Sequence, residues 1–358
     1  MSRYKVSDVA VEINERENSP ATSKYDRFVG LEHYVSGDVI IRNFGSTERL
    51  ESTMKVFQNG DVLVARRNVY LKRASMVDFD GLTSGDSIVL RAKDPTIGRI
   101  LPFVLNTDEF WDFADQYSDG TMSKRLSPKT LMKYEFDLPA EDELESFADL
   151  LWAANDTKES YQNLLAKTDE LVKSQFIEMF GNPIEKEKDE SQSRLGDLCI
   201  LKAGKFVKAD DIKEVQEEGL YPCYGGNGLR GYVPSFNQEG EFPLVGRQGA
   251  LCGNVQYAVG RFHATEHAVV VTPKIELDRY WLYHLLCLLD LNRYASGAAQ
   301  PGLAVNKLEE IRIVEPDLKL QRQYSEFAKQ SDKSKFELKQ NIENINSLMK
   351  SLMQQDFS

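Results

Sequence analysis

The chain has 358 residues, enough for two or three domains that each bury a core of their own. Its apolar content of 41% and charged content of 28% are ordinary for a globular protein. No apolar run approaches the roughly 18 residues that a membrane-spanning helix needs, and the first residues lack the apolar stretch that is typical of a secretory signal. We therefore expect a cytoplasmic protein that makes no membrane contact. The four cysteines form neither a C-x-x-C pair nor a disulfide framework, so we expect them to be reduced and mostly buried.

The net charge of −12 is concentrated in one segment of the chain. Residues 138–192 carry five basic and 14 acidic side chains, a net charge of −9, whereas residues 1–137 and 193–315 carry −2 each. Basic side chains can still gather on one face of a nearly neutral domain. The acidity of the whole chain therefore does not exclude nucleic acid as a partner.

Residues 1–138 are predicted to form a first domain of short strands separated by turns. Strand-like runs at 61–65 and 87–90 are rich in β-branched residues, and a helix is predicted over 108–115. Residues 65–73 hold four cations, an amide and a tyrosine without any acid. The candidate nucleic-acid contacts of this domain are Arg66, Arg67, Asn68, Tyr70, Lys72, Arg73, Lys124 and Arg125.

The chemistry of these side chains suits DNA. Arginine can bind guanine through two hydrogen bonds, asparagine and glutamine suit adenine, and lysine neutralises phosphate. Any one of them could equally be a solvated loop charge, and only their recurrence in the second half of the chain favours the functional reading.

Residues 139–183 are predicted to form one long helix. Pro139 and the three acids at 141–143 suit the first turn of a helix, because proline costs no hydrogen bond there and carboxylates favour the helix dipole. Gly181-Asn182-Pro183 is a strong stop signal.

Residues 184–315 are predicted to form a second domain in the same style, with glycine-rich turns at 225–231 and 246–253 and a helix over 278–291. Here glycines would let the backbone approach a ligand closely. The candidate contacts are Tyr224, Asn227, Arg230, Arg247, Gln248, Asn254 and Gln300.

Residues 316–358 are predicted to form a second long helix. Its apolar residues recur at spacings of 4, 3, 4 and 3, which is the seam of a coiled coil: Leu338, Ile342, Ile345, Met349 and Leu352. The first helix carries a more polar seam 177 residues earlier, so we expect the two helices to pair antiparallel. At about 1.5 Å per residue, the rod would be roughly 60 Å long.

The two halves of the chain are similar in sequence at an offset of about 177 residues, which grows to 181 upstream. Leu63–Arg66 aligns with Leu244–Arg247, and Ser123–Arg125 occupies the place of Ala299–Pro301. A period this long indicates a duplicated domain with a duplicated tail rather than a solenoid. Two similar units in one chain suit a target that has two parts.

Three patterns match catalytic motifs in their letters alone. His263-Ala-Thr-Glu266-His267 spells H-x-x-E-H but continues as a strand, whereas a zinc protease needs a helix. Gly226–Gly231 spells G-x-G-x-x-G without a following helix. Asp317 and Glu337 of a nuclease-like pattern fall on one helix, about 30 Å apart. We expect no catalytic site, no metal site and no cofactor in this chain.

The chain resembles the DNA-specificity (S) subunit of type I restriction–modification systems over essentially its whole length. The resemblance rests on Ser174–Pro183, Tyr224–Tyr232, Gly246–Gly253, Ala264–Val271 and Ser296–Leu303. It implies an α+β fold with two pseudo-symmetric mixed α/β target-recognition domains, joined by two long antiparallel helices that form a coiled coil. The first domain departs from the family pattern, since Arg66-Arg67-Asn68-Val69 stands where the second has Gly246-Arg247-Gln248-Gly249.

The same resemblance implies function and partners. Each domain would read one half of a split site in double-stranded DNA, and the helices would set the gap and dock two methyltransferase (M) subunits. Restriction/translocase (R) subunits would join for cleavage, and S-adenosylmethionine, ATP and Mg²⁺ would belong to the partners. Two alternatives stay open: the specificity subunit of a type IIB or IIG-like system, and a DNA-modifying enzyme that acts alone.

Overall fold

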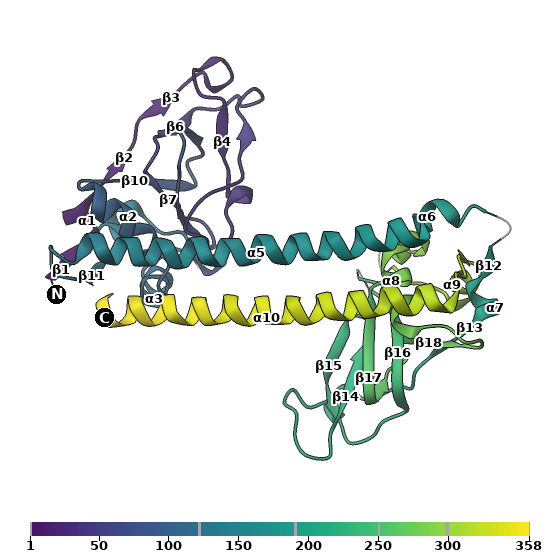
Figure 1. Cartoon of the computed structure of the whole chain (residues 1–358). Coiled ribbons are helices and arrows are strands. Elements are labelled where there is room, and N and C mark those ends of the chain that lie inside the picture. The colour runs from purple at the N-terminus through teal and green to yellow at the C-terminus, as the bar shows by residue number, and fades with distance from the viewer. Residues whose placement is uncertain (1, 121–122, 190–191, 250, 298–300, 358) are drawn as a thin grey trace. The chain divides into compact units, whose positions relative to one another are not determined.

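The computed structural model describes residues 2–120, 123–189, 192–249, 251–297 and 301–357. It consists of two compact units (Figure 1). Unit 1 comprises Met1–Gln162 and Lys339–Ser358, and unit 2 comprises Asn163–Leu338. Two long helices, α5 (Leu144–Phe180) and α10 (Leu318–Phe357), each contribute residues to both units.

The described residues of unit 1 form two sheets and a separate strand pair. The four-stranded sheet has the order β2-β10-β7-β8, the five-stranded sheet has the order β3-β6-β9-β4-β5, and β1 pairs with β11. The strands are β1 (Ser2–Lys5), β2 (Ala10–Ile13), β3 (Arg16–Glu17), β4 (Arg27–Val29), β5 (Gly45–Ser46), β6 (Met54–Phe57), β7 (Val62–Ala65), β8 (Ala74–Met76), β9 (Gly81–Thr83), β10 (Ser87–Ala92) and β11 (Glu135–Leu138). The short helices are α1 (Val6–Val9), α2 (Pro95–Val104), α3 (Asp108–Gln116) and α4 (Pro128–Leu131).

The central strands of unit 1 are buried on both faces. Ile88 and Leu90 of β10, with Val64 of β7, belong to the main core that the helices cover. Val89 and Leu63, which alternate with them along the same strands, belong to a second core. Because side chains alternate across a strand, this double burial explains the continuous apolar runs of β7 and β10.

In the part of unit 2 that the structure describes, the strands form a six-stranded sheet and one strand pair. The sheet has the order β13-β18-β16-β17-β14-β15, and β12 pairs with β19. The strands are β12 (Ser193–Arg194), β13 (Cys199–Ala203), β14 (Tyr221–Gly225), β15 (Gly228–Val233), β16 (Gln238–Gly246), β17 (Val255–Ala264), β18 (Ala268–Pro273) and β19 (Arg312–Ile313). The short helices are α6 (Pro183–Lys186), α7 (Leu195–Leu198), α8 (Arg279–Leu288) and α9 (Val305–Glu309).

The duplication seen in the sequence is also present in the topology. The order β2-β10-β7 in unit 1 corresponds to β13-β18-β16 in unit 2, and the pair β1/β11 corresponds to β12/β19. In each unit a one-turn helix, α1 or α7, follows the first strand. The predicted helices at 108–115 and 278–291 are α3 and α8, although α8 ends at Leu288.

Within unit 2 the end of α5 packs against the start of α10. Tyr324 is fully buried, its ring lies 5.1 Å from that of Phe176, and its hydroxyl donates a hydrogen bond to the Val172 carbonyl (3.4 Å). Further along α10, Lys335 donates to Asp169 at 2.8 Å. Because later residues of α10 meet earlier residues of α5, the two segments are antiparallel.

Within unit 1 the start of α5 and the end of α10 share the main core, through Leu144, Phe147 and Leu151 on one helix and Met349 on the other. The predicted fold class is therefore confirmed. The first long helix begins at Leu144 and not at Pro139, because Leu138 still pairs with Ser2 in a strand and the chain needs a turn before the helix. The predicted domain boundaries (1–138, 139–183, 184–315 and 316–358) stay a prediction.

The cysteines are free thiols, as expected. Cys199, Cys223 and Cys252 are buried, whereas Cys287 is exposed. Burial raises the pKa of the Cys199 thiol to about 12. Among the described residues, no helix has both the length and the apolar character to cross a membrane.

Candidate nucleic-acid interface

The candidate residues lie on one backbone frame that occurs in both units. In each unit a loop follows the central strand: residues 66–73 after β7, and residues 247–249 and 251–254 after β16. Each loop is hydrogen-bonded to a second segment, centred on Arg125 or Gly302, which lies 59 or 55 residues beyond the start of the loop. The equivalent bonds run from Leu126 N to Arg66 O (2.8 Å) and from Asn68 N to Lys124 O (2.9 Å) in unit 1, and from Leu303 N to Arg247 O (2.9 Å) and from Gly249 N to Pro301 O (3.0 Å) in unit 2.

This frame confirms one sequence alignment and corrects another. Arg66 is structurally equivalent to Arg247, as the sequence predicts. Lys124 is equivalent to Pro301, so the expected match between Ser123–Arg125 and Ala299–Pro301 is wrong by one residue. The bridge between Arg67 and Arg125 then corresponds to the bridge between Gln248 and Gly302. Gln300 lies outside the described residues.

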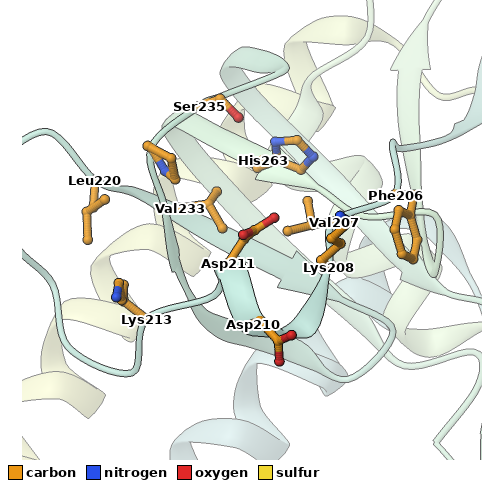
Figure 2. Close-up of a pocket in the computed structure, with 11 residues that line it drawn as sticks. Phe206, Val207, Lys208, Asp210, Asp211, Lys213, Leu220, Val233, Ser235 and His263 are labelled. Atoms are coloured by element: carbon orange, nitrogen blue, oxygen red, sulfur yellow. The ribbon is translucent and has the colours of Figure 1, made fainter.

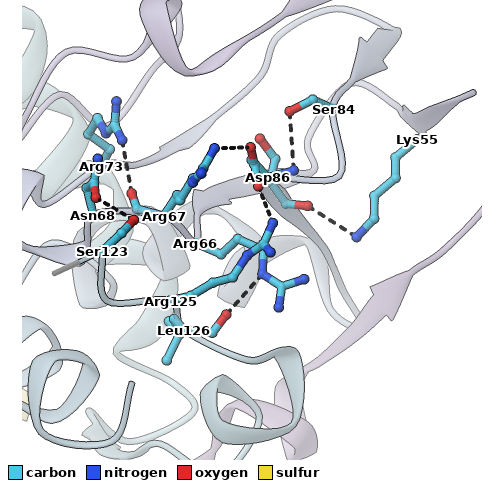
Figure 3. A network of polar contacts seen from close by, with 11 residues as sticks. Lys55, Arg66, Arg67, Asn68, Arg73, Ser84, Asp86, Ser123, Arg125 and Leu126 are labelled. Atoms are coloured by element: carbon cyan, nitrogen blue, oxygen red, sulfur yellow. Dashed lines mark hydrogen bonds and ion pairs between the residues drawn. The ribbon is translucent and has the colours of Figure 1, made fainter. Parts of the chain in front are cut away.

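Three arginines gather around one carboxylate in unit 1 (Figure 3). Arg67 Nη1 lies 3.5 Å from Asp86, and Arg125 forms a second ion pair with the same side chain. Arg66 donates to the Leu126 carbonyl at 3.2 Å, and burial beside Arg125 lowers the pKa of its guanidinium. Three guanidiniums therefore lie around the Asp86 carboxylate, and Glu12 is a further acid that acts on Arg66.

Asn68 and Arg73 hold the loop of unit 1 in shape. Asn68 has a left-handed backbone (φ 55°) and its side-chain oxygen accepts a hydrogen bond from Ser123 at 3.0 Å. Arg73 donates to the carbonyls of Leu31 (2.9 Å) and Arg67 (3.1 Å). Both side chains therefore fix the backbone from which Arg67 projects.

The two candidate lysines of unit 1 are paired with acids of α3. Lys72 donates to Asp108 at 2.8 Å, and Lys124 forms an ion pair with Asp115. Tyr70 is different, since 66% of its surface is exposed. Among the predicted contacts of this unit, Arg67, Tyr70 and Arg125 are thus the most accessible groups.

Asn227, Arg230 and Gln248 of unit 2 converge on one cavity of about 340 Å³, which His267 also lines. The first two come from the segment around the β14–β15 turn, and Gln248 comes from the loop after β16. The elements can approach because Gly246 has no side chain: a Cβ there would lie 1.8 Å from the Gly226 carbonyl oxygen. From the sequence we expected the glycine-rich turn to let the backbone approach a ligand. At Gly246 the backbone instead approaches another segment of the same chain.

The remaining candidates of unit 2 are less free. The Tyr224 ring packs edge-on against Phe262 with 5.6 Å between centroids, and burial raises the pKa of its hydroxyl. Asn254 accepts a hydrogen bond from Gly246 N (2.9 Å) through its backbone carbonyl. Arg247 is half-buried, and its Nε has no hydrogen-bond partner in the part of the chain that the structure describes.

The H-x-x-E-H pattern spans a strand end, a turn and the next strand. His263 is the penultimate residue of β17 and His267 directly precedes β18, so the expectation of one continuous strand is wrong. His263 lines a different cavity, of about 640 Å³, together with Val207 and Asp211 (Figure 2). Among the residues described, no group of three or more His, Cys, Asp or Glu side chains could hold a metal ion.

Asp86 is a residue that the sequence reasoning missed. An acid is repelled by phosphate, and a search for basic and amide side chains passes over it. Asp86 directly precedes the predicted strand at 87–90, which pairs with β7, the strand that leads into the arginine-rich loop.

Residues 187–347 match the family model described as the type I restriction modification DNA specificity domain. This stretch of the chain is therefore similar to the DNA specificity domain of type I restriction–modification systems. The resemblance seen in the sequence is thereby confirmed.

The chain is also similar to two curated specificity subunits. It is 49% identical over 140 residues, 38% of the chain, to the type I restriction enzyme EcoprrI specificity subunit of Escherichia coli. It is 35% identical over 106 residues, 29% of the chain, to a putative type I restriction enzyme specificity subunit of Haemophilus influenzae. The matches span only 34% and 28% of those relatives.

Solved structures share the fold over the full length. The type I restriction–modification S subunit from M. genitalium has a TM-score of 0.64 at 17% identity, with 100% of this chain and 96% of that chain covered. A chain from a structure of type I complex assembly and conformational transition has a TM-score of 0.54 at 18% identity, covering 99% and 97%. At these identities the likeness concerns the fold alone.

Proposed function

We propose that this specificity subunit reads a split, asymmetric site in double-stranded DNA, with each unit reading one half. The observation that carries the proposal is the repeated backbone frame. It presents guanidinium and amide groups at equivalent places in both units, although the side chains themselves differ. Equal frames with unequal side chains suit two half-sites of different sequence.

The exposed groups match the major-groove edges of bases. Arg67 and Arg125 offer paired N–H donors of the kind that guanine N7 and O6 accept, and Asn227 and Gln248 offer the donor and acceptor pair that adenine requires. Arg66 and Arg230 add positive charge for phosphates. Unit 1 is therefore proposed to read guanine and unit 2 to read adenine at the bases these side chains reach.

We further propose that α5 and α10 set the gap between the half-sites and dock two M subunits. Support comes from the solvent-facing side of α5 in unit 2, where Leu164 and Leu171 are 50% and 52% exposed. Exposed leucines on a helix suit a partner surface. R subunits would then join the assembly for cleavage.

The subunit is proposed to carry no chemistry of its own. S-adenosylmethionine would be bound by the M subunits, and ATP and Mg²⁺ by the R subunits. Support comes from the family, which is one of specificity subunits, and from the separation of the motif residues: His263 and His267 line different cavities.

Mapping methylated adenines tests the proposal. The chain is co-expressed with its M subunits, and the methylated sites should share two defined half-sites with a fixed gap. Arg67→Ala should relax one half-site and Gln248→Ala the other, whereas Arg99→Ala, which removes a partly exposed arginine paired with Asp149, should change neither.

Three outcomes count against the proposal. Relaxation of the same half-site by both variants would overturn the assignment of one half to each unit. Methylation or cleavage by the purified chain alone would support the stand-alone enzyme. A complex that copurifies with a single fused methylase–nuclease instead of M and R subunits would favour the type IIB or IIG-like system.

A further inference from the structure

Asp86 of unit 1 and His267 of unit 2 occupy the same place in the repeated frame. Each lies in a turn directly before the strand, β10 or β18, that pairs with the central strand. Three backbone-directed hydrogen bonds recur in the two units. They are Arg66 N to Asp86 O (2.9 Å), Asp86 N to Ser84 Oγ (3.2 Å) and Ser87 N to Ser84 O (3.2 Å) in unit 1, and Arg247 N to His267 O (3.0 Å), His267 N to Thr265 Oγ1 (3.4 Å) and Ala268 N to Thr265 O (3.0 Å) in unit 2.

The surroundings of this position are also equivalent, but the side chains differ. In unit 1 it faces Arg67 and Arg125. In unit 2 the corresponding places hold Gln248 and Gly302. A carboxylate therefore stands between two guanidiniums in one unit, and an imidazole stands beside an amide in the other.

In unit 1 the carboxylate restrains the two arginines. Only 24% of the Asp86 side chain is exposed, whereas 53% of Arg67 and 48% of Arg125 are exposed. Both long side chains are tethered to a short, largely covered one. The ion pairs restrain both arginines before a base arrives. The arginines therefore lose little conformational entropy when they bind it.

In unit 2 the imidazole forms part of the cavity wall. His267 lines the 340 Å³ cavity with Asn227, Arg230 and Gln248. Its Nε2 lies 3.1 Å from Glu266 Oε1, whereas its Nδ1 is buried and has no hydrogen-bond partner among the described residues. The acid beside it orients the ring, as a second group commonly does for a functional histidine.

We propose that the residue at this shared position determines which base its unit accepts. Asp86 is a positioning residue for two arginines that read guanine. His267 forms part of the cavity wall beside an amide that reads adenine. The inference rests on the proposed function and names specificity residues within it. Asp86 also opposes the DNA backbone through its charge, so it contributes selectivity at the expense of non-specific affinity.

The test uses the full chain in complex with its M subunits and a DNA library randomised at both half-sites. Asp86→Asn keeps the shape and removes the charge. It should lower the preference for guanine in one half-site at least about tenfold, the discrimination that a bidentate contact supplies. It should also strengthen binding to non-specific DNA at low salt, because one negative charge is lost near the phosphates. A merely structural role would weaken both.

His267→Gln should relax the other half-site only. Asp78→Asn is the matched control in unit 1, since Asp78 is half exposed and pairs with Arg42 outside the frame. It should leave every base preference unchanged. If Asp86→Asn fails to fold, His267→Gln decides, because the Nδ1 of that imidazole makes no hydrogen bond to the described residues.

The failures of the two proposals are distinguishable. If the wild-type complex shows no split-site preference, the proposed function is wrong. If the wild-type complex reads two half-sites and the folded Asp86→Asn and His267→Gln variants read them with unchanged base preferences, the inference about this position is overturned and the proposed function stands.

Discussion

Replacing Gly246 by alanine should loosen unit 2 while leaving unit 1 unchanged. The added methyl group would lie 1.8 Å from the Gly226 carbonyl oxygen, and real Cβ atoms do not come closer than about 3.0 Å to such a neighbour. The two segments must therefore separate by more than an ångström. The oxygen belongs to the backbone, so no side-chain rotation relieves the clash.

The free-energy cost follows from the contacts that the separation disturbs. Overpacking a tight site costs about 1–3 kcal/mol. Two backbone hydrogen bonds of Gly246, at 2.9 Å to the Asn254 carbonyl and 2.7 Å from Gly253 N, are strained as well, at roughly 1 kcal/mol each. We expect unit 2 to lose about 3 kcal/mol of its free energy of unfolding.

Hydrogen exchange measured by mass spectrometry resolves the effect by unit. A loss of about 3 kcal/mol should reduce the protection of core amides in β16 and β18 about a hundredfold, since each 1.4 kcal/mol is a factor of ten. Peptides from unit 1 serve as the internal reference. The control is Gly302→Ala, where the nearest atom to the new Cβ is 3.8 Å away and protection should not fall. Equal protection in the Gly246→Ala and Gly302→Ala variants would refute the close-approach argument.

Further predictions concern pH, packing and length. Burial lowers the pKa of the His284 imidazole to about 4. As the pH falls below 6.5, the unfolded chain takes up a proton that the folded unit does not bind, so the free energy of unfolding should fall by at most about 3 kcal/mol between pH 6.5 and 4. A urea midpoint that is independent of pH across this window would contradict the prediction. Phe176→Ala should lower the free energy of unfolding of unit 2 by about 3–5 kcal/mol in urea titrations, because its buried ring packs on Trp281 and Tyr324. Phe336→Ala is the control: Phe336 is 61% exposed, so its loss should change stability by less than about 0.5 kcal/mol. Inserting seven residues into both α5 and α10 at the unit boundary lengthens each helix by about 10 Å. The gap in the methylated sites should then grow by about three base pairs, while both half-sites stay the same. An unchanged gap would exclude the spacer role.

The long helices and the duplication were predictable from sequence because both depend on local signals. The helix α5 ends at Phe180, and the next residue, Gly181, has a left-handed backbone (φ 79°). The helix therefore ends at the Gly-Asn-Pro sequence that was predicted to stop it. Asp317 caps α10 through a 2.7 Å bond from Lys319 N. Such signals act within a few residues, so they can be recognised without knowledge of the fold.

The site was only partly predictable because its chemistry depends on partners distant in sequence. Nothing near Tyr224 indicates that Phe262 packs against its ring. Likewise, the glycine at 246 is required by a backbone segment 20 residues earlier, and Asp86 acquires its importance from Arg125, 39 residues later. Residue type alone therefore identified basic and amide groups but could not separate exposed donors from those already engaged.

Unit 1 is built from both termini of the described chain, and this has a consequence for biosynthesis. Met349 belongs to its main core and Lys350 donates to Asp108 at 2.7 Å. On the ribosome, residues 1–162 emerge before residues 339–358 and until then lack the helical segment that completes their core, whereas residues 163–338 form a continuous stretch. Folding of unit 1 must wait until residues 339–358 are translated, so a stop codon that removes this segment would damage a unit whose other residues are synthesised much earlier.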